Sequence, residues 1–507
     1  MQSDTISRFK TKPFDHQLEC LNKFGRRKYF ALLAEMGTGK TWIIINNIAD
    51  LWSDHDLDGV IVLAPNGVHH NWQLRELPKH MPDWVRLKSA VWSADANKTE
   101  RAALDELLCG NDSSELRMLM MNWEALQTKR GLAFAERFAN SCTRLMLVGD
   151  ESYYIKNPSA SRSKGLMKLK RYSKYRRIMN GTPITNSPFD AYSQFAFLDE
   201  TILGTTSYYA FKAEYAEMLQ EGDKLLDHIK KNMPLHKQRF TPQVVARDRA
   251  GRAKYRNLDK LQALIAPHSF RVLKSECLDL PKKIYKTAWF DVSAQQRVVY
   301  KKAAKECRLV LAGEETPINK LAALMKLAQI TSGYYIHPDS SDPVRIEGDN
   351  PKLALLRERV VSAIEQGKKV IVWARFRIEI EDIVRVLRED EIAVVEYHGG
   401  INKEGRTTAI EEFQHGEANV FVGQQQAGGT GITLTAASCV IYFSNTFSLH
   451  DRLQTEDRAH RIGQEQDVTY INLVARNTID ATIVDALMNK KDIADIITGD
   501  IKKLLPF

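Results

Sequence analysis

The stretch Ala34-Glu35-Met36-Gly37-Thr38-Gly39-Lys40-Thr41 decides the fold, because a tight glycine turn, a lysine and a hydroxyl directly precede an apolar segment with helical character at 41–51. Glycines free backbone N–H groups to approach phosphate oxygens, a lysine reaches the outer phosphates, and a threonine hydroxyl ligates Mg²⁺. The first glycine of the usual pattern is Ala34 here, so a strand-to-helix turn with an accidental lysine stays open. The predicted nucleotide contacts are Gly37, Thr38, Gly39, Lys40 and Thr41, with Thr41 also a metal ligand.

Composition sets wide limits on the class of protein. The chain has 507 residues, 44% of them hydrophobic and 27% charged, enough for about three to four domain-sized units. The N-terminal segment is polar and no run approaches the roughly 18 apolar residues of a membrane span, so we expect a soluble protein without membrane association. The six cysteines are scattered without a CxxC pair, which argues against a zinc site or a disulfide framework.

These features also bear on location and partners. The scattered cysteines favour a reducing compartment, such as the cytoplasm. The net charge of +9 favours a polyanionic partner without establishing one.

Apolar runs flank the phosphate loop at intervals that suit a parallel sheet. Residues 29–33 lead into the loop, and similar runs occupy 59–65, 117–123 and 143–149. Continuous apolar runs are typical of strands buried on both faces, and strands that alternate with helices indicate an α/β fold.

Two carboxylates and one amide are the next candidate contacts. The run 143–149 ends in Asp150 and Glu151, so we expect Asp150 to hold Mg²⁺ through water and Glu151 to polarise the attacking water, against the alternative of a solvated acidic turn. Gln17 stands near the predicted start of a helix upstream of the loop. Its carboxamide can donate to and accept from one adenine edge, although a lone glutamine is equally typical of a solvated helix.

The order of motifs resembles that of the Swi/Snf-type ATPases of helicase superfamily 2. The matching segments are DESY at 150–153, IKN at 155–157, IMNGTPITN at 178–186 and FAFL at 195–198. The EMG-x-GKT form of the phosphate loop and the Asn71-Trp72 pair match as well. Tyr153 departs from the pattern, since the family usually has histidine there, and this leaves open which hydrogen bond reaches the Gly181-Thr182 turn. The resemblance implies two tandem RecA-like lobes that couple ATP hydrolysis to movement along duplex DNA.

The middle of the chain lacks the alternation of strands and helices. We predict a first lobe at 1–198, a helical insertion and linker at 199–283, the start of a second lobe with its own helical insertion at 284–350, the rest of that lobe at 351–485, and a C-terminal brace and tail at 486–507. The basic section 230–260 either touches phosphates or is only solvated. Residues 340–350, rich in Asp, Ser and Gly, read as a flexible loop.

A second α/β pattern starts at 351 and has no phosphate loop. Predicted helices at 351–365, 378–388 and 403–414 alternate with strands at 369–373, 393–397, 420–423, 440–443 and 468–473. The segment QTEDRAHRIGQ at 454–464 resembles the last motif of the family and places Arg458 and Arg461 on one face of a short helix. Planar guanidinium groups suit phosphoryl oxygens, so we expect both to act as arginine fingers on an ATP site between the lobes.

The resemblance also assigns nucleic-acid contacts. The glycine-rich turn 427–434 resembles a family motif that contacts both DNA phosphate and ATP. The resemblance therefore implies that Gly431 contacts the nucleotide. Thr478-Ile479-Asp480 and the helix that follows look like the C-terminal brace of the family. The expected DNA contacts are Asn71, Trp72, Asn122, Arg375, Gly400, Arg406, Gly428, Gly429 and Thr433.

The resulting hypothesis is an α/β protein of two RecA-like lobes with helical insertions, which acts as a DNA-dependent ATPase and double-stranded DNA translocase. It implies ATP and Mg²⁺ as cofactors and duplex DNA, bound without sequence preference, as partner, and it names no protein partner. Two alternatives are a strand-separating DNA or RNA helicase of the same superfamily and a DNA-binding scaffold with a decayed ATP site. Lys40, Asp150, Glu151, Arg458 and Arg461 are all present, which argues against decay.

Overall fold

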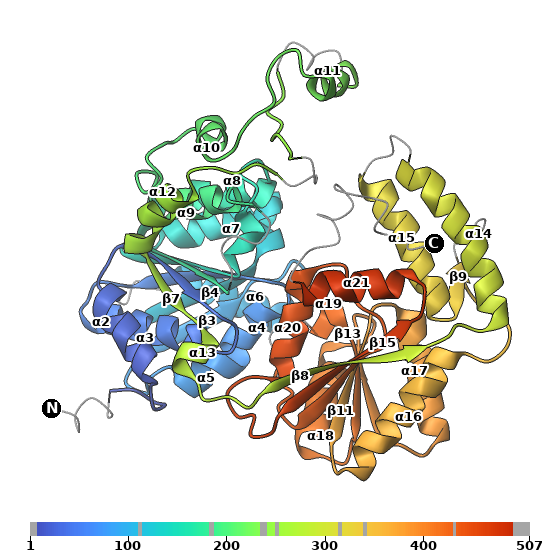
Figure 1. Cartoon of the computed structure of the whole chain (residues 1–507). Coiled ribbons are helices and arrows are strands. Elements are labelled where there is room, and N and C mark those ends of the chain that lie inside the picture. The colour runs from blue at the N-terminus through green and yellow to red at the C-terminus, as the bar shows by residue number, and fades with distance from the viewer. Residues whose placement is uncertain are drawn as a thin grey trace. The chain divides into compact units, whose positions relative to one another are not determined.

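The structure is a computed structural model of the whole chain. It describes residues 8–109, 114–181, 187–233, 241–248, 253–312, 317–337, 342–428 and 432–489. The chain divides into two compact units, Met1–Leu278 (unit 1) and Asp279–Phe507 (unit 2), each built on its own sheet (Figure 1).

Unit 1 contains, among its described residues, a seven-stranded sheet in the order β3-β4-β2-β5-β6-β1-β7, with every neighbouring pair parallel. This confirms the predicted α/β class. The strands are β1 (Tyr29–Ala34), β2 (Gly59–Ala64), β3 (Leu87–Val91), β4 (Leu116–Asn122), β5 (Leu145–Asp150), β6 (Ser173–Asn180) and β7 (Ser269–Val272).

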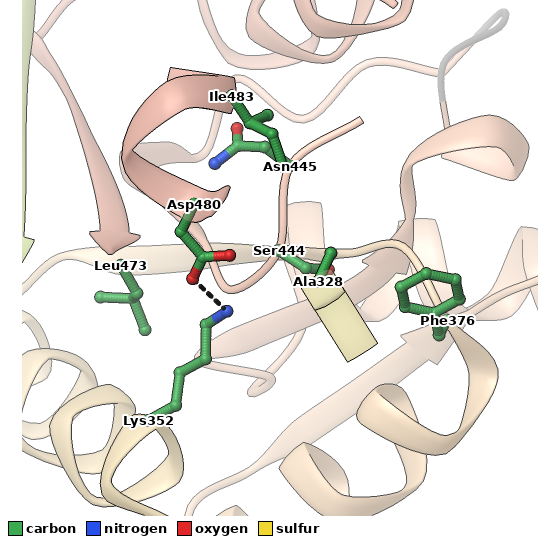
Figure 2. Close-up of a pocket in the computed structure, with 8 residues that line it drawn as sticks. All are labelled: Ala328, Lys352, Phe376, Ser444, Asn445, Leu473, Asp480 and Ile483. Atoms are coloured by element: carbon green, nitrogen blue, oxygen red, sulfur yellow. Dashed lines mark hydrogen bonds and ion pairs between the residues drawn. The ribbon is translucent and has the colours of Figure 1, made fainter. Parts of the chain in front are cut away.

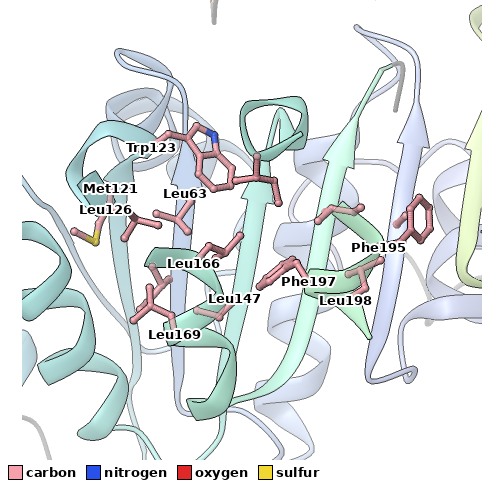
Figure 3. Close-up of a cluster of buried hydrophobic side chains, with 14 of the residues drawn as sticks. Leu63, Met121, Trp123, Leu126, Leu147, Leu166, Leu169, Phe195, Phe197 and Leu198 are labelled. Carbon is pink, nitrogen blue, oxygen red and sulfur yellow. The ribbon is translucent and has the colours of Figure 1, made fainter. Parts of the chain in front are cut away.

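Helices cover both faces of this sheet, and successive residues of one strand enter opposite cores. Ala31 and Leu33 of β1 belong to one buried cluster, whereas Phe30 and Leu32 belong to the other. Figure 3 shows the first cluster, which includes Trp123, Leu147 and Phe197. The principal helices of unit 1 are α2 (Asp15–Phe24), α3 (Lys40–Ser53), α6 (Lys98–Cys109), α7 (Lys129–Asn140), α8 (Ser161–Leu169) and α9 (Asp190–Leu198).

The segment after α9 differs in part from the predicted helical insertion. It contains α10 (Tyr208–Tyr215), α11 (Lys224–Lys231) and α12 (Leu258–Ile265), as expected for helices. The chain then returns to the sheet as β7, which pairs in parallel with β1. The interpretation of this stretch as insertion and linker alone was wrong, because Phe270 and Val272 of β7 are buried against β1. The four-residue strand is too short to stand out in the sequence.

Unit 2 contains, within the part of the chain that the structure describes, a six-stranded parallel sheet in the order β12-β13-β11-β14-β15-β8. Its strands are β8 (Lys283–Phe290), β11 (Lys369–Ala374), β12 (Val394–Tyr397), β13 (Val420–Gln424), β14 (Ala437–Tyr442) and β15 (Val468–Ala475). The strands predicted at 369–373, 393–397, 420–423, 440–443 and 468–473 are confirmed as β11 to β15. The predicted loop at 340–350 contains β10 (Pro343–Arg345), which pairs antiparallel with β9 (Tyr334–Ile336).

The helices of unit 2 include α14 (Ala294–Ala312), α15 (Pro317–Thr331), α16 (Pro351–Glu365), α17 (Arg377–Glu389), α18 (Lys403–His415), α20 (Leu449–Ala459) and α21 (Ile479–Met488). A buried ion pair fixes the start of α21: Lys352 Nζ lies 3.3 Å from Asp480 Oδ2 (Figure 2). The Thr331 hydroxyl donates to the other oxygen of Asp480 at 2.8 Å, so this carboxylate joins α15, α16 and α21. None of the helices in the described ranges has the length and apolar character needed to span a bilayer.

Candidate nucleotide and nucleic-acid site

The candidate residues of unit 1 lie where parallel strands end. The phosphate loop follows β1, Asn71 follows β2, Asn122 ends β4, and Asp150 ends β5. The carboxyl ends of parallel strands share one edge of a sheet, and this edge is where open α/β sheets bind ligands. The topology therefore brings the phosphate loop and the Asp150 carboxylate, separated in sequence by more than one hundred residues, to one edge.

The phosphate loop has the backbone that its sequence predicts. Gly37 and Gly39 have φ of 83° and 84°, a left-handed conformation that side chains resist. Lys40 begins α3, and its buried Nζ donates to the carbonyl of Ala34 at 2.9 Å. The loop therefore combines an ammonium, glycine backbone amides and a helix N-terminus, a donor set that suits phosphate.

Helix α2 is fastened to this loop by two side chains. His16 Nε2 lies 2.8 Å from the carbonyl of Thr38, and Gln17 Nε2 donates to the carbonyl of Gly39 at 3.4 Å. Gln17 Oε1 also accepts the Phe14 N–H at 2.9 Å. Because Gln17 is only 2% exposed, its amide is a structural contact of the loop. The adenine contact expected from the sequence stays a prediction, and nothing in the sequence singled out His16.

Asp150 is held by two indole rings. Trp72 Nε1 donates to Asp150 Oδ2 at 3.0 Å, and Trp123 Nε1 donates to the backbone carbonyl of Asp150 at 2.9 Å. Burial raises the pKa of Asp150 to about 6, the Glu151 charge adds to the rise, and the Trp72 hydrogen bond and the Lys40 charge oppose it. Glu151 adopts φ of 51°, a left-handed conformation that costs a non-glycine residue about 1–3 kcal/mol and clusters at functional sites.

Trp72 does not match its predicted role as a DNA contact. Its side chain is 1% exposed and its N–H is engaged by Asp150, so no part of the indole is presented to a ligand outside the protein. Asn71, at the end of α4 (Val68–Asn71), is half-buried and stays a candidate contact. Trp72 instead begins a five-residue π-helix, η1 (Trp72–Glu76), a distortion that often marks functional sites. The sequence pattern located this residue but gave no sign of its partner.

A hydrogen-bonded link joins the acidic pair to the end of β6. The Ser152 hydroxyl donates to Gln194 Oε1 at 2.5 Å, and Asn180 Nδ2 donates to the same oxygen at 3.4 Å. Gln194 thus connects Ser152 to Asn180, a contact that the sequence did not predict. Residues 182–186, which include the predicted Thr182 turn, lie outside the described residues.

The predicted Mg²⁺ site has two protein ligands, Thr41 and Asp150. No group of three or more His, Cys, Asp or Glu side chains that could hold a metal occurs among the described residues. Proteins usually hold Mg²⁺ with one or two carboxylates together with the phosphates of a nucleotide. Asp150, which ends β5, and Thr41, in the first turn of α3, supply one carboxylate and one hydroxyl and stay the predicted pair of ligands.

In unit 2, Arg458 and Arg461 converge on a single carbonyl oxygen. The Nη1 atoms of Arg458 and Arg461 donate to Ile432 O at 3.1 Å and 3.2 Å. Helix α20 ends at Ala459, with His460 as its C-cap, so the prediction that both arginines share one helical face was wrong. Arg461 reaches the same oxygen from the turn beyond the helix, because His460 leaves the helical conformation.

The glycine-rich turn is described only in part. Gly428 is the last residue of the short helix α19 (Gln425–Gly428), and Thr433 is half-buried. Gly429 and Gly431 lie outside the described residues, so their predicted contacts to DNA and nucleotide stay predictions.

The remaining DNA candidates also follow strand ends or lie on a nearby helix. Gly400, after β12, is exposed, and Arg406 on α18 is half-buried. Arg375, after β11, is less open than expected: its Nη2 contacts Met325 Sδ at 3.1 Å and its guanidinium lies 4.0 Å from the ring centroid of Phe447. Burial lowers the pKa of Arg375. The interpretation of Arg375 as an open phosphate contact therefore disagrees with the structure.

Two family descriptions match the chain in order. The SNF2-related domain matches residues 16–336, and the helicase conserved C-terminal domain matches residues 351–463. The chain belongs to the SNF2-related family. The resemblance drawn from its motifs is thereby confirmed, as is the expected pair of sheet domains.

Curated relatives from vertebrates and bacteria are similar over most of this chain. A zebrafish (Danio rerio) chromodomain-helicase-DNA-binding protein 1-like is 26% identical over 473 residues, which cover 91% of this chain and 41% of that protein. The uncharacterized ATP-dependent helicase MG018 of Mycoplasma genitalium is 25% identical, over 93% of this chain and 40% of the relative. The putative ATP-dependent helicase/translocase YwqA of Bacillus subtilis is 25% identical, over 92% and 46%. The SNF2-family chain thus spans less than half the length of these relatives.

Among solved structures, the SWI2/SNF2 ATPase core of Sulfolobus solfataricus in complex with dsDNA aligns with this SNF2-family chain at 25% identity. The TM-score is 0.40, and the alignment covers 97% of this chain and 94% of that one.

Proposed function

We propose that this SNF2-family chain is a DNA-dependent ATPase that moves along double-stranded DNA without separating the strands, and that this movement remodels DNA or displaces bound factors. The observation that carries the proposal is the shared sheet edge of unit 1, where Lys40, Asp150 and the Asn71-Trp72 segment meet. The Trp72 hydrogen bond joins the segment expected to contact DNA to the carboxylate expected to hold the metal.

The residues of unit 1 fit ATP with Mg²⁺. The amides of Gly37 and Gly39 and the Lys40 ammonium would bind the phosphates, while Thr41 and Asp150 would hold the metal. The bound nucleotide supplies the phosphoryl group whose transfer to water drives the cycle. Glu151 would orient the water, and the rigid strand end of β5 keeps this carboxylate beside Asp150.

Unit 2 contains the two arginines that we propose as arginine fingers. Arg458 and Arg461 would stabilise negative charge on the transferring phosphoryl oxygens, a role for which guanidinium groups are suited. Their common contact with Ile432 ties them to the glycine-rich turn expected to contact DNA. We propose that this contact lets DNA at the turn influence the position of both arginines.

DNA binding would be mainly to phosphates. Asn71, Asn122, Gly400, Arg406, Gly428 and Thr433 supply amides, hydroxyls and one guanidinium rather than a helix shaped for base readout. The net charge of +9 agrees with a polyanionic partner. The names helicase and translocase among the relatives support a motor of this kind.

The deciding experiment separates a translocase from a strand-separating helicase. The protein is given ATP with a duplex that carries a third strand in its major groove and, separately, with a forked duplex that carries a labelled strand. Release of the third strand with the fork intact supports the proposal. Unwinding of the fork, particularly from a single-stranded tail, contradicts it and supports the helicase reading. DNA binding without ATP hydrolysis, whether duplex DNA, single-stranded DNA or RNA is added, would instead support the inactive scaffold.

A further inference from the structure

Unit 2 contains a cavity of about 610 Å³ that none of the candidate site residues lines. One wall is α14, and the other is the connection from β15 to α21, which includes Arg476 and Thr478 (Figure 1). A cavity of this size is in the range of binding sites for small ligands or for the anchoring side chains of a peptide.

The rim of this cavity is basic. Arg297, Lys301 and Lys305 recur every four residues on α14, so they share one face of the helix, and Arg476 faces them from the other wall. Arg297 and Arg476 share one carboxylate, that of Asp291, at 3.8 Å and 3.1 Å. Lys301 and Lys305 form no ion pair within the described residues. Four cationic side chains therefore line the cavity, and two of them share the Asp291 carboxylate.

The floor of the cavity is apolar and well fixed. Val292, Tyr300 and Ala304 are all buried, and all three line the cavity. The Tyr300 hydroxyl accepts the backbone N–H of Ile479 at 2.8 Å, which ties α14 to the first turn of α21. The floor can therefore receive an apolar side chain without the helices having to move.

We propose that this cavity binds an acidic, amphipathic segment of a partner polypeptide. An apolar side chain of that segment would occupy the floor, and its carboxylates would lie against Lys301 and Lys305. This combination of apolar anchor and opposite charge is the common basis of groove recognition between proteins. The site lies outside the nucleotide and DNA residues, so it does not depend on the proposed function.

Two features favour a polypeptide over a nucleic-acid backbone. Phosphate-backbone binding gains from many free cations, whereas two of the four cations here already share Asp291. The apolar residues of the cavity offer nothing to a phosphate backbone. A peptide would use both these apolar residues and the two lysines, Lys301 and Lys305, that form no ion pair among the described residues.

The test uses the full chain and a fluorescein-labelled synthetic amphipathic helix with leucine at i, i+3, i+4 and i+7 and glutamate on the opposite face, and the control probe is the same helix with lysine in place of glutamate. Fluorescence anisotropy should show binding of the acidic helix alone, weakened by added salt. Reversing both charges, Lys301→Glu with Lys305→Glu, should weaken binding by about tenfold or more. The matched control is Lys302→Glu, since Lys302 is exposed beside Lys301 but does not line the cavity. Its affinity should stay within about twofold of the unchanged protein.

Three results would overturn the proposal: no binding of the acidic helix to the unchanged protein, equal loss in the double and control variants, or displacement of the helix by duplex DNA together with lost DNA affinity in the double variant. The last result would assign the cavity to nucleic acid. If thermal denaturation shows that the charge reversals destabilise the fold, Lys301→Gln with Lys305→Gln replaces them and must give the same loss of affinity.

Discussion

Trp72 Nε1 donates a hydrogen bond to Asp150 Oδ2 at 3.0 Å, which joins the segment after β2 to the carboxylate at the end of β5. Since Asn71 directly precedes Trp72, a shift of this segment on DNA binding would be transmitted to Asp150. We predict that Trp72→Phe, which keeps the ring but removes the donor, lowers the DNA-stimulated ATPase rate. A hydrogen bond to a charged group contributes about 1.5–3 kcal/mol, which corresponds to about a 10- to 100-fold change in rate.

The variant should also need more Mg²⁺ for half-maximal activity, because its metal carboxylate is less well positioned. The matched control is Trp84→Phe, which removes another tryptophan donor in unit 1, on an exposed ring that bonds to the Arg8 carbonyl. The measurement is the DNA-stimulated ATPase rate of both variants over a range of Mg²⁺ concentrations. Identical behaviour of the two variants would show that the Trp72 contact is only structural.

Within unit 1, the sequence predicts the strands that are apolar throughout and misses those that are not. In unit 1 the apolar strands β2, β4 and β5 lie inside the sheet, whereas β3 and β7 form its two edges. Edge strands bury less surface and carry polar residues, so they do not read as apolar runs. Strand β6 escaped notice because it contains Arg176 and Arg177; Arg177 is nevertheless buried, with hydrogen bonds to backbone carbonyls and to Asn47.

In the candidate site, the sequence predicted several functional residues but not the side chains that contact them. Motifs identify Lys40, Asp150 and Arg458 because these residue types have characteristic neighbours in the chain. Gln194 and the Trp72 hydrogen bond depend on contacts between distant segments, which a single sequence does not encode in any local pattern.

The Lys352–Asp480 pair gives a prediction about stability. Lys352 is 1% exposed, so Lys352→Met leaves the Asp480 carboxylate buried without its cation. Breaking a buried pair on one side costs about 3–5 kcal/mol, and unit 2 should unfold at correspondingly lower denaturant concentration. Adding Asp480→Leu to Lys352→Met should recover most of the loss, whereas an additive effect of the two substitutions in urea denaturation would contradict this account.

Arg458 and Arg461 share a contact with Ile432, but their removal should have different effects because they differ in burial and position. Arg458 is buried and also donates to the Gln454 carbonyl, so Arg458→Ala should lower both turnover and stability. Arg461 is half-buried and lies beyond α20, so Arg461→Ala should keep the fold and nucleotide binding. Loss of an arginine finger costs about 10³-fold or more in rate. ATP hydrolysis at the unchanged rate by Arg461→Ala, with DNA present, would show that this arginine is not a finger.

Arg406 and Arg375 should differ in their effect on DNA binding. For a phosphate contact, Arg406→Ala should weaken binding to all duplex sequences alike and reduce the magnitude of the log–log salt slope by about one. Arg375→Ala should change the slope less, because the guanidinium is half-buried against Phe447 and Met325. Equilibrium binding to two unrelated duplexes over a range of salt concentrations measures both effects. A slope unchanged in Arg406→Ala would remove this residue from the DNA site.

The reactivity of one buried cysteine in each unit, Cys20 in unit 1 and Cys439 in unit 2, should measure the unfolding of that unit. Burial raises the pKa of Cys20 in unit 1 to about 12 and that of Cys439 in unit 2 to about 11, from an ordinary value of 9.0. Both thiols should therefore resist a disulfide reagent at pH 8, whereas the exposed Cys109 should react at once. A raised folded-state pKa means that the native protein holds the proton more tightly. This contribution to stability is complete below pH 9 and is lost as the pH rises toward 11 and 12.

Graded urea at pH 8 should then expose Cys20 and Cys439 at the separate midpoints of their units, and both midpoints should fall at pH 10. Mass spectrometry of the labelled peptides identifies which thiol reacts. Rapid labelling of Cys20 or Cys439 without urea would contradict the burial of these side chains. A common midpoint that persists in Lys352→Met, which weakens unit 2 alone, would show that the two units unfold as one.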